Sequence, residues 1–186
     1  MARLVTLAIT SLDGYVADAD GGFDWAAPAE DLHQYVNDLD RQIGTHLYGR
    51  RMYEVMQYWE TAGQGADEPA VERDYAAVWQ ATDKVVYSRT LDAVTTRRTR
   101  LERSFEPDAV RALVASADRD VSVGGPGLAS VAFRAGLVDE ILLFAHPVVV
   151  GGGIRALPDG VRADLDLVDE RTFSGGVRHA RYRVRR

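Results

Sequence analysis

The 186-residue sequence contains no cysteine and a single lysine, Lys84. The lack of cysteine excludes a disulfide framework, a thiolate nucleophile, an iron–sulfur cluster and a zinc–thiolate site. Schiff-base chemistry would have to use Lys84, which directly precedes an apolar, strand-like run and has no evident partner. Chemistry that depends on sulfur is therefore excluded, and lysine chemistry rests on one position.

Long apolar runs and an excess of positive charge are also absent. No apolar stretch approaches the roughly 18 residues of a membrane span, and the first ten residues do not form a secretory signal, so we expect a cytoplasmic protein with no membrane partner. Basic residues number 22 and acidic residues 28, which gives a net charge of −6. Nucleic acid is therefore not expected as a partner. With 46% apolar residues, the chain can build one core, and we expect a single domain over residues 1–186.

Strand-like runs rich in β-branched residues alternate with segments of helical periodicity. We expect strands at 3–10, 45–48, 84–88, 120–123 and 141–150. The helices are expected at 28–44, 50–59, 71–81, 107–117 and 128–135. The end of the chain, residues 165–173 and 177–184, is typical of an antiparallel hairpin. The sequence thus predicts an α/β fold: a mixed, mostly parallel sheet flanked by helices, with a C-terminal antiparallel hairpin.

Two strand-to-helix junctions carry glycine, at Gly49 and at Gly124–Gly127. Free amide groups at the positive end of a helix favour an anion. Arg50 and Arg51 directly follow the first junction, and guanidinium groups hydrogen-bond phosphate oxygens. Each arginine alone is also typical of a surface ion pair, and each glycine of a tight turn. The second junction departs from the Rossmann spacing, because Ser130 takes the last glycine position.

The histidines show no metal-binding pattern. His33, His46, His146 and His179 have neither the HExxH arrangement nor a paired ligand spacing, so no metal site is expected. The sequence also lacks the GxSxG and SxxK motifs, which are the commonest local signs of a serine nucleophile.

Five segments, in order, resemble the dihydrofolate reductase family, and more closely the bacterial reductases related to the reductase domain of riboflavin biosynthesis (RibD C-terminal domain). The segment SLDGYVA at 11–17 is similar to a loop of the riboflavin-type members. The segment YGRRMYE at 48–54 resembles a helix start, and DKVVYSR at 83–89 resembles the strand that ends at the adenosine 2′-phosphate. The segment VSVGGPG at 121–127 resembles the pyrophosphate-binding turn, and PVVVGGG at 147–153 the following central strand.

This resemblance implies an NADPH-dependent reductase. Arginine side chains and Ser88 suit the 2′-phosphate, the second glycine junction suits the pyrophosphate, and backbone groups at the end of the first strand would contact the nicotinamide. Met52 stands where the family usually offers a hydroxyl to the cofactor phosphates. The implied cofactor-binding residues are Ala8, Ile9, Gly14, Tyr15, Gly49, Arg50, Arg51, Met52, Ser88, Arg89, Gly124, Gly125, Pro126, Gly127 and Leu128.

Three acids are candidates for catalysis. By the resemblance, Asp31 or Glu30 would take the place of the pterin-binding acid of folate reductases. A carboxyl group in a semi-apolar pocket can have its pKa raised enough to deliver a proton. Either residue is equally typical of a first-turn acid that stabilises the helix dipole. Asp13 is the third candidate, or else the side chain of an Asx turn before Gly14.

Aromatic residues are candidates for substrate binding. Trp25 and Tyr53 could stack on a planar substrate, although burial in the core is the commoner use of such side chains. The segment 57–69 lacks the DxPxL-type substrate element of true riboflavin reductases.

The resemblance therefore implies hydride transfer to a small conjugated C=N or C=O substrate, such as a pterin- or pyrimidine-like heterocycle, without identifying it. A catalytically silent NADPH-binding sensor or assembly module is the alternative from another class, and a flavin-linked reductase is a third. A homodimer is implied by the resemblance alone.

Overall fold

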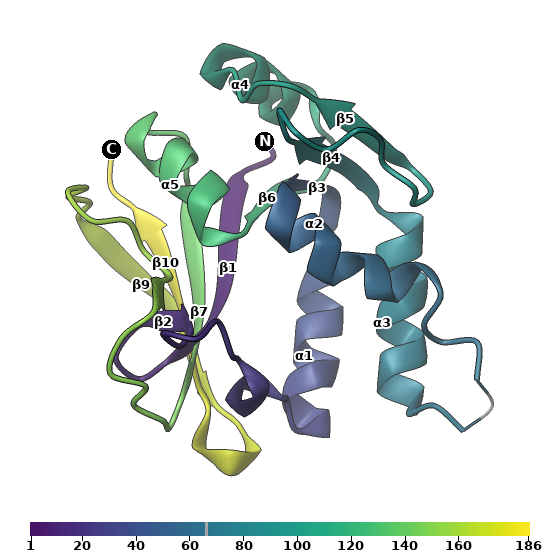
Figure 1. The fold of residues 1–186 in the computed structure, drawn as a ribbon. Coiled ribbons are helices and arrows are strands. Elements are labelled where there is room, and N and C mark those ends of the chain that lie inside the picture. Colours follow the sequence, from purple (N-terminus) through teal and green to yellow (C-terminus); the bar gives the residue numbers. More distant parts are fainter. Residues whose placement is uncertain (66) are drawn as a thin grey trace.

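The structure is a computed structural model that describes residues 1–65 and 67–186. Its centre is an eight-stranded sheet in the order β5-β4-β3-β6-β1-β7-β10-β9 (Figure 1). These strands are β1 (Leu4–Ser11), β3 (Ile43–Gly49), β4 (Asp83–Tyr87), β5 (Thr99–Glu102), β6 (Asp120–Gly124), β7 (Glu140–His146), β9 (Leu165–Thr172) and β10 (Arg178–Val184). A second, antiparallel pair consists of β2 (Tyr15–Ala17) and β8 (Ile154–Arg155).

The large sheet is mixed and mostly parallel. Neighbouring strands from β5 to β7 all pair in parallel, whereas β10 pairs antiparallel with both β7 and β9. The predicted fold class, including the C-terminal hairpin, is confirmed. Because the carboxyl ends of β1, β3, β4, β6 and β7 meet along one side of the sheet, we call that side the carboxyl edge and the opposite side the amino edge.

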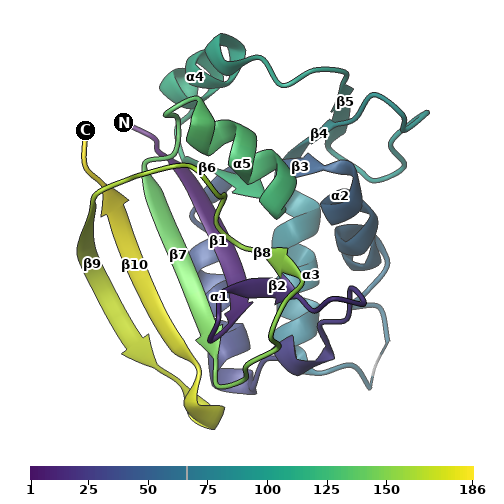
Figure 2. The same cartoon turned by 60° about the vertical axis from the view of Figure 1, so that its left-hand side comes forward.

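Helices cover both faces of the sheet (Figures 1 and 2). Consecutive residues of β3 point to opposite faces and show this division: Leu47 packs with Val110 and Ala129, whereas Tyr48 packs with Trp79. One face is therefore covered by α4 and α5, and the other by α1 and α3. The helices are α1 (Glu30–Asp40), α2 (Arg50–Met56), α3 (Ala70–Ala81), α4 (Pro107–Ser116) and α5 (Pro126–Arg134), with short 3-10 turns η1 (Asp24–Ala26), η2 (Gln57–Glu60) and η3 (Ser174–Gly176).

Three local predictions are corrected. The strand expected over 141–150 ends at His146, because Pro147 has no amide hydrogen with which to continue the ladder. The expected loop at 13–27 contains β2 and η1. The arginine-rich connection after β4 contains β5, a four-residue edge strand too short and too polar to show a clear period in the sequence.

No helix among the described residues has the length and apolar character needed to cross a membrane.

Candidate functional site

A gap opens between β1 and β6 near the carboxyl edge. Pairing of these strands stops at Thr6 opposite Val123, whereas β1 continues alongside β7 as far as Ser11. The Thr6 hydroxyl donates a hydrogen bond to the Val123 carbonyl over 3.2 Å, at the last rung of the β1–β6 ladder. The final residues of β1 are therefore paired on one side only in the described structure.

The backbone groups that face this gap follow from the register. Residues of a parallel strand bond alternately to its two neighbours. The Arg3 carbonyl accepts from β6 at Val121, and the Leu4 carbonyl accepts from the residue before β7. Odd-numbered residues of β1 therefore face β6, so the amide and carbonyl of Ile9 face the gap and those of Ala8 face β7. Of the two residues predicted to contact nicotinamide, Ile9 has its backbone groups on the open side.

The two glycine junctions meet at the same edge. Gly125 caps α5 with φ +87°, a conformation that favours glycine, and a Cβ there would lie 3.1 Å from Met52 Cβ. A Cβ on Gly124 would lie 3.0 Å from the Tyr48 ring, and one on Gly49 3.7 Å from Leu128 Cβ. Glycine at 124 and 125 thus lets the β3–α2 and β6–α5 turns approach closely.

The start of α5 carries uncapped amide groups. Its N-cap residue offers no side-chain hydrogen bond, and Pro126 occupies the first turn, where a missing N–H costs nothing. The first amide with an internal partner is that of Ala129, which donates to the Gly125 carbonyl over 3.0 Å. Nothing lies within 4 Å of a Cβ built on Gly127. The amides of Gly127 and Leu128 therefore form an accessible donor pair at the positive end of a helix.

The turn after β4 is held by its own side chains. The Ser88 hydroxyl accepts hydrogen bonds from the amides of Thr90 (3.2 Å) and Leu91 (3.0 Å). The Arg103 guanidinium donates to the carbonyls of Ser88 (3.3 Å) and Leu91 (2.6 Å). Sequence reasoning missed Arg103, because it reaches this turn through the pairing of β5 with β4, which no local pattern indicates.

The three arginines predicted to bind phosphate differ in their surroundings. Arg50 donates to Glu54 over 2.7 Å and to the Thr90 hydroxyl over 3.0 Å, so it forms the expected surface ion pair and also links α2 to the turn after β4. Arg51 and Arg89 are exposed and make no hydrogen bond or ion pair with another described side chain. Both keep their donors available for a ligand.

Asp13 fastens the segment that follows β7. Its carboxylate accepts hydrogen bonds from the amides of Val150 (3.2 Å) and Gly151 (2.8 Å). The Ser11 hydroxyl is the main reason that the pKa of Asp13 lies below its usual value. Asp13 therefore has a clear positioning role, and a catalytic one stays a prediction.

Gly14 and Tyr15 lie where the chain turns over the end of β1. Gly14 has φ +88°, and its carbonyl accepts from the Ala156 amide over 3.0 Å. Tyr15 begins β2, and the Arg155 guanidinium of β8 lies 5.2 Å from its ring centre. The β2–β8 pair thus lies across the carboxyl end of β1 as a cover (Figure 2).

The acids at the start of α1 are exposed. Asp31 accepts hydrogen bonds from the amides of Ser174 at the hairpin tip and of Leu32, each over 2.9 Å. The Ser174 amide is the main cause of a pKa below the usual value. The expectation of a raised pKa is therefore wrong for Asp31. Glu30 occupies the first turn, as the helix-dipole interpretation requires.

The two aromatic candidates lie in different surroundings. Tyr53 is 1% exposed, and its hydroxyl accepts from the amides of Thr95 (2.9 Å) and Thr96 (3.3 Å). It belongs to the core, so the prediction that it stacks on substrate is wrong. Trp25 is partly exposed in η1, and its ring centre lies 5.8 Å from that of His146. Sequence reasoning considered His146 only as a metal ligand, although its place at a strand end was a usable signal.

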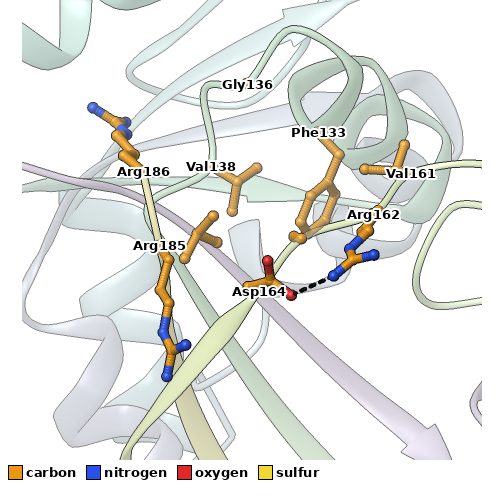
Figure 3. A pocket seen from close by; sticks show the side chains of 10 residues that line it. Phe133, Gly136, Val138, Val161, Arg162, Asp164, Arg185 and Arg186 are labelled. Carbon is orange, nitrogen blue, oxygen red and sulfur yellow. Dashed lines mark hydrogen bonds and ion pairs between the residues drawn. The ribbon is translucent and has the colours of Figure 1, made fainter.

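Two hollows lie at the amino edge. The first, of about 350 Å³, is bounded by α5, residues 161–164 and the last residues of the chain (Figure 3). Its arginines are paired with aspartates, as with Arg162 and Asp164 at 3.4 Å. The second, of about 390 Å³, lies beside Arg41 and Asp74, which form an ion pair. Neither hollow includes a predicted site residue.

The sheet order, the C-terminal hairpin and the glycine turns at the carboxyl edge define a dihydrofolate-reductase-like α/β protein. The chain belongs to the RibD C-terminal domain family, whose model matches residues 3–178. This family comprises the reductase part of RibD proteins, and membership makes this chain an oxidoreductase by class.

Known relatives agree with this assignment. The "Uncharacterized protein YyaP" of Bacillus subtilis (strain 168) is 31% identical over 176 residues, 94% of this chain and 90% of that protein. The riboflavin biosynthesis protein RibD of Mycobacterium tuberculosis is 32% identical over 81% of this chain, which spans 43% of that protein's length. A solved pyrimidine reductase-like protein of Corynebacterium diphtheriae has a TM-score of 0.71 at 16% identity, covering 100% of this chain and 92% of that one.

Proposed function

We propose that this protein is an NADPH-dependent reductase that transfers a hydride to a conjugated C=N or C=O group of a small pterin- or pyrimidine-like heterocycle. The observation that carries the proposal is the open side of β1, with the Ile9 amide and carbonyl facing the gap next to two closely packed glycine turns. Family membership supplies the class of reaction.

The residues at the carboxyl edge fit a dinucleotide. The amides of Gly127 and Leu128 are suited to the pyrophosphate, since they are uncapped and lie at a positive helix end. The Ile9 amide and carbonyl complement the carbonyl and amino groups of a nicotinamide carboxamide, which gives the ring a defined face. When bound, NADPH would supply the hydride.

The arginines around the turn after β4 support a preference for NADPH over NADH. Arg89 is exposed beside the turn that Ser88 and Arg103 hold, and Arg50 reaches Thr90 in the same turn. Guanidinium groups at this place complement a 2′-phosphate, which NADH lacks. Because the hydroxyl of Ser88 accepts the turn amides, Ser88 would shape this subsite and Arg89 would supply the charge.

The acids are better suited to orienting groups than to donating a proton. Asp13 and Asp31 both have pKa values below their usual range, because hydrogen-bond donors surround the carboxylates. Both are therefore ionised at neutral pH. The proton that completes the reduction would then come from water or from another group around the substrate, and neither carboxyl group would supply it.

Nucleotide titration tests the proposal. NADPH and NADH are titrated into wild-type protein, Arg89→Ala and the control Arg162→Ala, which lies at the amino edge. Loss of one charge-assisted hydrogen bond costs about 1.5 to 3 kcal/mol, so Arg89→Ala should weaken NADPH binding about 10- to 100-fold and leave NADH unchanged. A wild-type protein that binds neither nucleotide would refute the proposal. Binding without oxidation of NADPH by any pterin, pyrimidine or quinone would instead favour the silent binding module.

A further inference from the structure

The carbonyls of the turn after β4 are gathered by a single guanidinium group, that of Arg103, which lies directly after β5. Its Nη1 donates hydrogen bonds to the carbonyls of Leu91 (2.6 Å) and Ser88 (3.3 Å). Its Nη2 donates to the carbonyl of Asp92 over 3.4 Å. Hydrogen bonds from a charged donor are about twice as strong as neutral ones, so Arg103 holds three carbonyls of one turn in a fixed arrangement.

One of these bonds acts directly on the backbone of Arg89. The Ser88 carbonyl belongs to the peptide group that leads into Arg89. Because a peptide group is planar, a bond to that carbonyl restrains the direction in which the Arg89 side chain leaves the backbone. Arg50 also reaches this turn, but it donates to the Thr90 hydroxyl over 3.0 Å and so bonds a side chain. Arg103 is therefore placed to position the exposed arginine of the turn.

Carbonyl partners leave the charge of Arg103 uncompensated. Arg103 forms no ion pair with a carboxylate in the part of the chain that the structure describes, whereas Arg50 is paired with Glu54 at 2.7 Å. The Glu54 carboxylate and, to a smaller extent, Asp92 in the turn raise the pKa of Arg50. Free carbonyl oxygens would repel a phosphate group, so a cation bonded to three of them makes the turn more favourable to an anion.

We propose that Arg103 is a positioning residue that determines the preference for NADPH over NADH. It holds the Arg89 side chain where the 2′-phosphate would bind, and it prevents the carbonyl oxygens of the turn from repelling that phosphate. This inference rests on the proposed function, and it adds a residue outside the turn on which the selection of the cofactor depends. A residue that only closed a surface turn would affect the binding of NADPH and of NADH equally, or would affect neither.

The test titrates NADPH and NADH into wild-type protein and into variants of Arg103. Arg103→Met removes the donors and the charge, whereas Arg103→Lys keeps a charge and loses the planar fork. Arg100→Met is the matched control, because Arg100 lies on the same strand, is exposed and pairs with Glu102 at 3.3 Å. Adenosine 2′,5′-bisphosphate and adenosine 5′-phosphate, which differ only in the 2′-phosphate, repeat the comparison without the nicotinamide half. Urea unfolding of each variant reports whether it folds.

We expect Arg103→Met to weaken NADPH binding about tenfold and NADH binding less than about twofold. Arg103→Lys should lose about threefold in NADPH affinity, and Arg100→Met should leave both affinities unchanged. The double variant separates positioning from an independent charge. Arg89→Ala should weaken NADPH binding by a factor about threefold smaller in the Arg103→Met protein than in wild-type protein, because an arginine that is no longer held in place contributes less to binding.

Three results would overturn the inference and leave the proposed function standing, provided that wild-type protein prefers NADPH. They are an unchanged ratio of NADPH to NADH affinity in Arg103→Met, an equal loss for both nucleotides, and strictly additive effects of the substitutions at Arg89 and Arg103. If Arg103→Met does not fold, the same comparisons with Arg103→Lys decide. Wild-type protein that binds neither nucleotide, or both equally, would refute the preference for NADPH and this inference together. Selection of NADPH through Arg103 without reduction of any substrate would keep this inference and refute the proposed hydride transfer.

Discussion

Lys84, the one lysine of the chain, gives a quantitative test of the core. It is 1% exposed on β4, where its ammonium donates to the carbonyls of Trp79 (2.9 Å) and Thr82 (2.8 Å) and lies 4.1 Å from the Trp79 ring centre. Burial lowers the pKa of Lys84 from 10.5 to about 8. Because its amine is enclosed, Lys84 is also unsuited to Schiff-base chemistry.

The sign of the pH effect follows from proton uptake. Between about pH 8 and 10.5, the unfolded chain keeps the Lys84 proton while the folded chain has lost it. The free energy of unfolding therefore rises with pH over this window, and this added stability is lost as the pH falls through the folded-state pKa of Lys84. With these two pKa values, wild-type protein should gain about 2 kcal/mol between pH 7 and pH 9.5 from this residue.

The variant Lys84→Met removes the titration while keeping a long side chain. Urea unfolding of both proteins at the two pH values gives four free energies of unfolding, and the difference of differences isolates Lys84 from the tyrosines and histidines. Wild-type protein should gain about 2 kcal/mol more than the variant on going to pH 9.5. An equal change in both proteins would show that Lys84 titrates normally and that its burial is not as described.

Two further predictions concern positions at the candidate site. Gly125→Ala should lower the free energy of unfolding by about 1 to 3 kcal/mol, because φ is +87° and the new Cβ would lie 3.1 Å from Met52 Cβ. Gly127→Ala is the control, since a Cβ there meets nothing within 4 Å, and an equal small loss in both variants would contradict this prediction. Tyr53→Phe should lower the free energy of unfolding by about 1 to 3 kcal/mol in the same urea assay, because it leaves the Thr95 and Thr96 amides unpaired, and NADPH affinity should not change. Weaker NADPH binding with unaltered stability would instead indicate that Tyr53 takes part in nucleotide binding.

Much of the fold could be predicted because its signals are local. The run Leu4–Ser11, the proline at the start of α4 and the glycines before α5 each carry their own periodicity or turn chemistry. The predictions that were wrong involve weak or misleading local signals. The strand expected to reach Val150 stops at His146, since one proline interrupts a run that is otherwise apolar.

The candidate site was predicted in part for the same reason. Strand-to-helix glycines and the arginines that follow them are contiguous in sequence, so the carboxyl edge of the sheet gathers Gly49, Arg50, Gly125 and Leu128 once parallel pairing is assumed. Contacts between distant segments could not be foreseen. Arg103 reaches the turn after β4 through β5, and the indole of Trp25 meets His146 from more than a hundred residues away.

By itself, then, the sequence determined the order of the longer strands and helices, the absence of thiol chemistry and the family resemblance, because each depends on residue types at short spacing. The tertiary structure decided which groups are available. It buried Tyr53 and Lys84, lowered the pKa of Asp31 through an amide at Ser174, and left the Ile9 backbone facing a gap. Burial, hydrogen bonding and strand register depend on partners that the chain brings together only on folding, and these partners set the chemistry of the site.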